Sequence, residues 1–182
     1  YEHSKALEVI ESFFWQFCDD YIELVKNRAY GTAGAHGKVP SDAAVKSART
    51  TLGLGLDAFA RLLAPYLPFA TEEVWSWMHT GEGSVHRAAW PKADIYAAAA
   101  TGASPETLAW AGKAVEQLRK IKSEAKVSMK TPILSVTLAA VKDGIDAIKS
   151  ALDDVAQAGR VIGKFDLAEK HAEEAAAEGE GD

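Results

Sequence analysis

The sequence predicts a mainly α protein: a helical bundle followed by a small α+β subdomain in the order helix, strand, helix, strand. Apolar residues recur at steps of three and four through residues 3–29 and again through 45–63, which is the period of a buried helix face. Residues 133–139 and 161–167 instead alternate apolar and polar side chains, as half-buried strands do. A helical pattern at 143–158 separates the two, so we expect a crossover unit.

The first helix, residues 3–29, carries two neighbouring apolar stripes that together cover about 200° of its circumference. So wide an arc requires neighbours on more than one side of the helix. A glycine-containing loop follows at residues 30–40, and Ser41 is a good N-cap for the second helix. Glycine is unfavourable inside a helix, so we attribute Gly53 and Gly55 to the close approach of another element.

A short third helix is expected to begin at Pro68, and residues 84–91 are expected to be extended. The run of small residues at 97–103 is the expected connector between subdomains. We therefore place the helical bundle at residues 1–96 and the α+β subdomain at 97–168, with its first helix running to about Ala125.

The net charge of −6 is concentrated at the C-terminus. Residues 1–165 hold 19 basic and 19 acidic side chains, whereas 166–182 hold seven acids against Lys170. We therefore expect residues 169–182 to form a solvated acidic tail. Between Lys113 and Lys130 six basic residues oppose two acids, which fits either a polyanion-binding surface or the solvated face of a helix.

Composition and motifs exclude several classes of protein. The single cysteine, Cys18, has no partner for an internal disulfide, and the five histidines are not at metal-ligand spacing. No apolar run reaches the ~18 residues that cross a bilayer, no secretory signal is present, and no phosphate-binding glycine loop occurs. We expect a cytoplasmic binding or structural module with no catalytic residue, no metal and no membrane segment.

Four segments resemble a known family, the valine–tRNA ligases, and occur in the same order. The string Phe-Cys-Asp-Asp-Tyr-Ile-Glu-Leu-Val-Lys at 17–26 resembles a helix of that family, and Pro-Phe-Ala-Thr-Glu-Glu-Val-Trp at 68–75 resembles a turn that valine, isoleucine and leucine ligases share. Residues 84–91, which end in Trp-Pro, and 118–128 are similar to two further segments. The first string favours the valine ligases within the class.

The resemblance implies the C-terminal anticodon-binding region of a class I aminoacyl-tRNA synthetase, with a helical bundle and a small α+β fold that contact tRNA. The family's ATP-binding signatures, His-x-Gly-His and Lys-Met-Ser-Lys-Ser, do not occur in this sequence. It follows that ATP, valine and the editing site belong to catalytic and editing domains outside it. The family's bundle also has a further helix before residue 1, so we expect an uncovered apolar face on the first helix, and self-association through it.

Three candidate tRNA-binding residues lie in the first helix. Trp15 is at the edge of the apolar arc, where its ring either packs in the core or stacks on an unpaired base. Asp20 and Arg28 match or flank the family motif, and the alternative for both is a surface ion pair or a helix cap.

The other candidates are basic residues in and just after the fourth helix: Arg119, Lys120, Lys122, Lys126 and Lys130. Arg119, Lys122 and Lys126 have the spacing i, i+3, i+7 and share one face, as a phosphate-binding track would. Lys122 also lies within the apolar stripe, so a lysine with a buried stem is the alternative for that residue.

Three hypotheses for the function remain. The first is tRNA recognition as part of a valine–tRNA ligase. The second is the same region of an isoleucine or leucine ligase. The third is a free-standing helical module that binds another protein through its apolar face.

Overall fold

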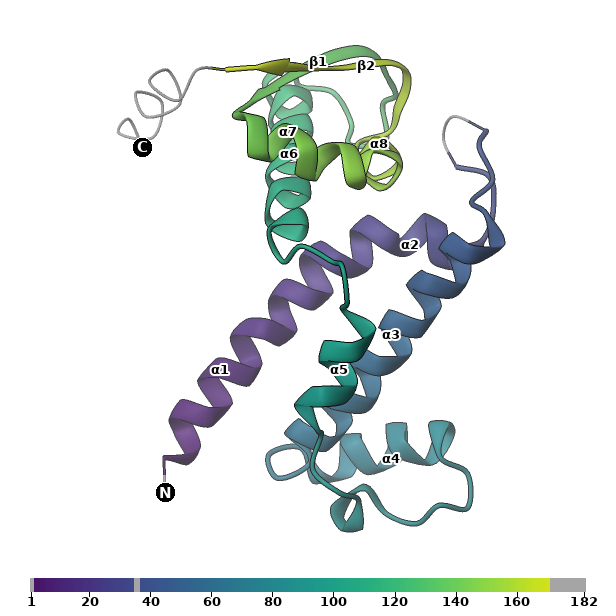
Figure 1. Cartoon of the computed structure of the whole chain (residues 1–182), viewed down its shortest axis with the longest axis vertical. Helices are drawn as coiled ribbons and strands as arrows, with labels where there is room; N and C mark the ends of the chain where they lie inside the picture. Colours follow the sequence, from purple (N-terminus) through teal and green to yellow (C-terminus); the bar gives the residue numbers. More distant parts are fainter. Residues whose placement is uncertain (1, 35–36, 171–182) are drawn as a thin grey trace. The chain divides into compact units, whose positions relative to one another are not determined.

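The structure, a computed structural model, describes residues 2–34 and 37–170, and the chain forms two compact units (Figure 1). The first unit consists of Tyr1–Ile22 and Lys46–Gly102, and the second of Glu23–Val45 and Ala103–Asp182. The division that we expected at 96/97 therefore differs from these units. Glu23–Val45, which we expected in the helical bundle, instead belongs to the unit that holds the C-terminal part of the chain.

The single helix expected at 3–29 is instead three consecutive helical segments. These are α1 (His3–Gln16), the π-helical segment η1 (Phe17–Ile22) and α2 (Glu23–Tyr30). A π turn adds a residue to the turn and is frequent at functional sites. Apolar spacing of three and four residues does not distinguish it from an α-helix. The π turns end at Ile22, where the chain passes from the first unit to the second.

The first unit also contains α3 (Asp42–Leu63) from Lys46 onward, α4 (Pro68–Met78) and α5 (Ala93–Ala99). Ser41 caps α3 as expected, because its Oγ accepts a hydrogen bond from the Ala44 backbone N–H at 3.3 Å. The segment expected to be extended contains a 3₁₀ turn, Val85–Arg87, which Ser84 caps. The expected connector at 97–103 begins inside α5.

Aromatic rings join α1 and η1 to α3. Phe13, Phe14 and Phe17 contact Phe59, with ring centroids 5.2–5.5 Å apart. The close approach predicted at Gly55 is confirmed, since a Cβ there would lie 2.6 Å from Phe17. The same prediction for Gly53 is wrong, because no atom lies within 4 Å of a Cβ at that position.

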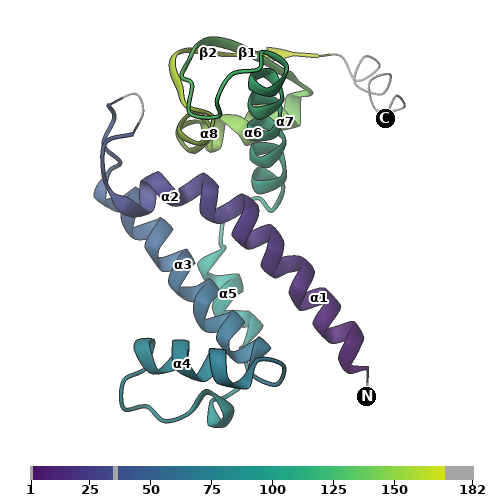
Figure 2. The ribbon, with the colours of Figure 1, turned by 180° about the vertical axis from the view of Figure 1, so that it is seen from behind.

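The second unit has the predicted helix–strand–helix–strand order. It contains α6 (Glu106–Glu124), β1 (Ile133–Ala140), α7 (Lys142–Ser150), α8 (Leu152–Gly159) and β2 (Val161–Glu169). The two strands pair in parallel, as a crossover unit requires, and the helices lie against one face of this small sheet (Figures 1 and 2). The fold class predicted from the sequence, mainly α with a small α+β part, is confirmed.

Local details of the second unit differ from the prediction. The helix expected at 143–158 is broken at Ala151, whose backbone leaves the helical region. Leu134 belongs to the apolar set of the alternating pattern at 133–139 but is 70% exposed, and the strand register shifts by one residue between Ile133 and Ser135. Glu169 belongs to β2, so the strand extends into the expected acidic tail. Residues 171–182 of that tail lie outside the described residues.

The core of the second unit is formed by apolar side chains of α6, α8 and the start of β2, chiefly Leu118, Val155 and Val161. None of the helices in the described part of the chain is both long and apolar enough to cross a membrane.

Candidate nucleic-acid interface

The end of α6 and the loop after it form an exposed basic ridge, defined here as Arg119, Lys120, Lys126 and Lys130. Lys126 closes the helix with a left-handed backbone conformation, φ 52°. The following loop is held by two backbone hydrogen bonds, from Lys126 to Ser123 and from Val127 to Lys122. Exposed basic side chains of this kind can contact phosphates.

Lys122, the fifth predicted member, does not belong to this ridge. Its side chain is only 4% exposed, and its Nζ donates hydrogen bonds to the carbonyl oxygens of Met129 at 3.0 Å and Gly159 at 2.9 Å. Burial lowers the pKa of this ammonium, and the charge of Arg160 lowers it further. A phosphate cannot reach the buried ammonium. Lys122 instead fastens the loop after α6 to the C-terminal end of α8.

Arg28 also has a structural contact. Its Nη2 lies 2.9 Å from Oδ2 of Asp154, and both side chains are largely buried. Burial raises the pKa of Asp154, whereas Arg28 lowers it and Asp153 raises it. A second ion pair joins Lys38 to Asp153. These two pairs fix α2 and the loop after it to α8, which explains why Glu23–Val45 belongs to the second unit.

Trp15 and Asp20 are both exposed, on α1 and η1 of the first unit. The Trp15 ring is 54% exposed, and its Nε1 donates a long hydrogen bond of 3.5 Å to Glu11. Of the two alternatives for Trp15, burial in the core is therefore wrong for this chain. Its exposed ring is available to stack on an unpaired base.

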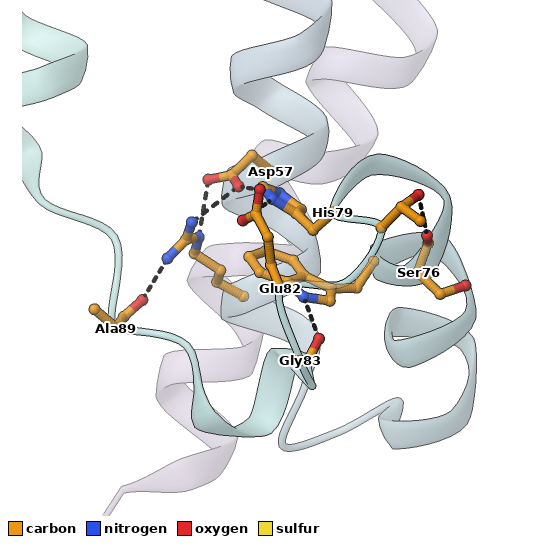
Figure 3. A network of polar contacts seen from close by, with 9 residues as sticks. Asp57, Ser76, His79, Glu82, Gly83 and Ala89 are labelled. Atoms are coloured by element: carbon orange, nitrogen blue, oxygen red, sulfur yellow. Dashed lines mark hydrogen bonds and ion pairs between the residues drawn. The ribbon is translucent and has the colours of Figure 1, made fainter.

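A polar network that the sequence did not indicate joins α3 to α4 and to the segment after α4 (Figure 3). Asp57 is at its centre, because its carboxylate accepts two hydrogen bonds from Arg61, of 2.9 and 3.0 Å, and lies 3.1 Å from Nε2 of His79. The other ring nitrogen of His79 lies 2.9 Å from Glu82. Arg61 also donates to the carbonyl oxygen of Ala89 at 2.8 Å.

Trp75 packs against this network. Its ring stacks on His79 with centroids 3.7 Å apart, and the Arg61 guanidinium lies 4.8 Å from the indole centroid. The indole N–H donates to the carbonyl oxygen of Gly83 at 3.0 Å, and Trp75 is 3% exposed. The polar groups pair with one another beside the buried ring, so this network joins α3 to α4 and to the segment after α4.

Cys18, the one cysteine of the sequence, is a free thiol. Burial raises the pKa of the Cys18 thiol, and the neighbouring Asp19 raises it further, so the thiolate nucleophile is disfavoured. No group of three or more His, Cys, Asp and Glu side chains within residues 2–34 and 37–170 has the arrangement of a metal site.

An exposed tryptophan and exposed basic residues at a helix end are features that RNA-binding proteins use for base stacking and phosphate contacts. The family comparison agrees with this class. The chain belongs to the family of anticodon-binding domains of tRNA ligases, whose model matches residues 1–138.

Curated relatives with the name valine–tRNA ligase match nearly the whole chain. The protein of Bifidobacterium longum is 82% identical over 179 residues, which is 98% of this chain and 20% of that protein. The protein of Leifsonia xyli is 45% identical over 162 residues, 89% of this chain and 18% of its own length. The protein of Thermobifida fusca is 45% identical over 163 residues, which is 88% of this chain and 17% of that protein. The chain thus spans about a fifth of the length of these relatives.

Proposed function

We propose that the chain is the anticodon-recognition region of a valine–tRNA ligase, the enzyme that attaches valine to its tRNA with the use of ATP. The observation that carries the proposal is the 82% identity to a protein of that name across 98% of the chain. The match to the anticodon-binding family over residues 1–138 supports the same role. Isoleucine and leucine ligases and a free-standing protein-binding module are not favoured by these matches.

Two surfaces would share the binding of tRNA. The basic ridge (Arg119, Lys120, Lys126 and Lys130) contacts backbone phosphates and contributes affinity that does not depend on base identity. Trp15 stacks on an unpaired base. Asp20, exposed on the π turns, is the remaining candidate for a contact with a base edge.

The test is binding of the purified chain to valine-accepting tRNA and to the same tRNA with a mutated anticodon, each measured across a range of salt concentrations. Tighter binding of the unaltered anticodon is expected. Replacing Arg119 or Lys126 by Ala should weaken both complexes equally and reduce the slope of log affinity against log salt by roughly 0.7 to 0.9. Trp15→Ala should leave the slope unchanged and weaken the complex with the unaltered anticodon more. Equal binding of both tRNAs by the unmodified chain contradicts anticodon recognition.

Catalysis would lie in other parts of the longer protein, together with the sites for ATP and valine and the editing site, and the natural setting would be the cytoplasm. The purified chain is then expected to give no valine-dependent exchange of pyrophosphate into ATP. Any such exchange by the chain alone would contradict the proposal.

Self-association is the remaining part of the proposal. On α1, Val9, Phe13 and Trp15 are 68%, 54% and 54% exposed, and none of the described residues of α1 is buried. Exposed apolar side chains on one helix favour contact with another apolar surface. Light scattering over a concentration series should show a mass above 19.5 kDa that falls when Val9 and Phe13 are replaced by Ser. A constant monomer mass would contradict it.

A further inference from the structure

A cavity of about 510 Å³ opens between α2, the turn that follows it and the end of α8, entirely within the second unit. The volume lies in the range of about 300–1,000 Å³ that is typical of small-molecule sites. Six of its ten lining residues have polar side chains, among them Lys26, Asn27, Tyr30 and Arg160. A polar cavity of this kind suits a ligand that has both a flat apolar face and hydrogen-bonding edges.

Arg160 is held in this lining at an energetic cost. It follows the last residue of α8 with φ 54° and ψ 44°, the left-handed conformation that glycine adopts at most such helix ends. For a residue with a Cβ, that conformation has a free-energy cost of roughly 1–2 kcal/mol. The backbone is fixed on both sides, because its N–H donates to Gln157 at 3.1 Å and its carbonyl oxygen accepts from Ile133 at 2.9 Å. Strained backbone positions cluster at functional sites, and the residue at this one carries a guanidinium.

Charge in the cavity lining depends on Arg160. Lys26 is paired with Glu23 at 3.0 Å, so these two charges largely cancel. Among the described residues Arg160 forms no salt bridge. The guanidinium is therefore available to an external anion. The buried ammonium of Lys122, bound to the carbonyl oxygen of Gly159, fixes the residue next to Arg160.

Tyr30, the last residue of α2, supplies an aromatic face. Its side chain is 67% exposed although it contributes to the cavity lining, so the ring lies at the rim. Aromatic rings at the edge of a positively charged site are the usual platforms for unstacked bases. Asn27, one turn before Tyr30 on the same helix, carries an amide that can donate to and accept from a base edge.

We propose that this cavity binds one unstacked nucleobase of a tRNA loop, with Tyr30 against the face of the base and Arg160 on an adjoining phosphate. The inference rests on the proposed function. It places Arg160, which lies outside residues 1–138 that match the family model, in the tRNA-binding site. None of the residues predicted from the sequence lines this cavity.

The experiment measures affinity of the full chain for valine-accepting tRNA and for a fully base-paired RNA with the same number of phosphates. Tyr30→Ala should weaken the tRNA complex roughly 5- to 150-fold, the range for loss of one stacked base, and leave the paired RNA and the salt slope unaffected. Arg160→Gly should weaken the tRNA complex and reduce the salt slope by about 0.7, while the midpoint of thermal unfolding stays the same or rises. Lys149→Ala, an exposed cation on α7 of the same unit, is the matched control and should change neither.

The outcomes separate the cavity from the wider proposal. If the unmodified chain binds no tRNA, the proposed function is wrong. If it binds tRNA and both Tyr30→Ala and Arg160→Gly bind equally tightly while remaining folded, the role of the cavity is overturned and the proposed function stands. If Tyr30→Ala weakens the paired RNA to the same extent as tRNA, the contact does not involve an unstacked base, and the proposal is again overturned.

Discussion

Replacing Lys122 by Met tests whether this lysine is a structural tie or a tRNA ligand. Methionine has a similar length and no charge, so Lys122→Met preserves the packing of the stem and removes both hydrogen bonds of the ammonium. The carbonyl oxygens of Met129 and Gly159 then lose their donor. We expect a destabilised second unit and unchanged salt dependence of tRNA binding in the molecules that remain folded.

The magnitude follows from the two contacts. A hydrogen bond to a charged donor contributes about 1.5–3 kcal/mol, so the two together amount to about 3–6 kcal/mol. Part of this is returned, because the variant no longer buries a charge. A net loss of about 2–3 kcal/mol remains, which in a unit of this size corresponds to a fall of roughly 10–20 °C in its unfolding midpoint.

The assay is thermal and urea unfolding followed by circular dichroism, with hydrogen exchange of α6 and α8 peptides to identify the unit that opens. Lys120→Met is the matched control, since Lys120 is exposed on the same helix. A pH series adds a second test. Burial lowers the pKa of Lys122 in the folded chain below its ordinary 10.5. Between these two pKa values the unfolded chain binds more protons than the folded chain, so this group's contribution to stability rises with pH in that range. Lys122→Met should lose that rise. Equal stability of the Lys122 and Lys120 variants would refute the reasoning.

Other substitutions test the helix contacts and one carboxyl group. Gly53→Ala should stabilise the chain by about 0.5–1 kcal/mol, because a Cβ there meets no other atom. Gly55→Ala should destabilise it by about 1–3 kcal/mol, because its Cβ meets Phe17. A higher urea midpoint for the Gly55 variant than for the Gly53 variant would contradict the packing described. Asp57→Asn removes the negative charge and one of the two acceptor oxygens that face Arg61 and His79, and it should cost about 1–3 kcal/mol in urea unfolding. A neutral effect would show that the network is dispensable. Burial raises the folded pKa of Asp154 above its ordinary 3.8, so the folded chain binds more protons than the unfolded chain between the two pKa values. This group's contribution to stability therefore falls as pH rises through that window. Asp154→Asn should flatten the fall, and an unchanged pH profile would count against it.

Periodicity predicted most of the fold because its strongest signals are local. The α3 helix follows from a capping serine and a regular apolar stripe, and β1 and β2 follow from alternation. Features that depend on one extra or missing residue were not predictable. Three such features are the π turns of η1, the break at Ala151 and the register shift between Ile133 and Ser135. Each changes the phase of a pattern without changing its composition.

The candidate site was predicted less well, because burial and pairing join residues far apart in sequence. Asp57 and His79 are 22 residues apart, and Arg28 and Asp154 are 126 apart, so spacing gives no indication of either contact. Lys122 did carry a signal. Its position among apolar neighbours on α6 indicated a buried stem, and the structure shows that the ammonium is buried as well.

The basic residues at the end of α6 differ in the surroundings of their charges. A cation buried at helix C-terminal ends satisfies carbonyl oxygens and the negative end of the helix dipole, and it is shielded from salt. Lys122 has this position between α6 and α8. Lys126 and Arg160 follow these two helices in left-handed conformations, and the charge of Arg160 acts on the Lys122 ammonium. Because Lys122 already satisfies the carbonyl of Gly159, the Arg160 side chain is not needed for that purpose. The fold can therefore use it for an RNA phosphate.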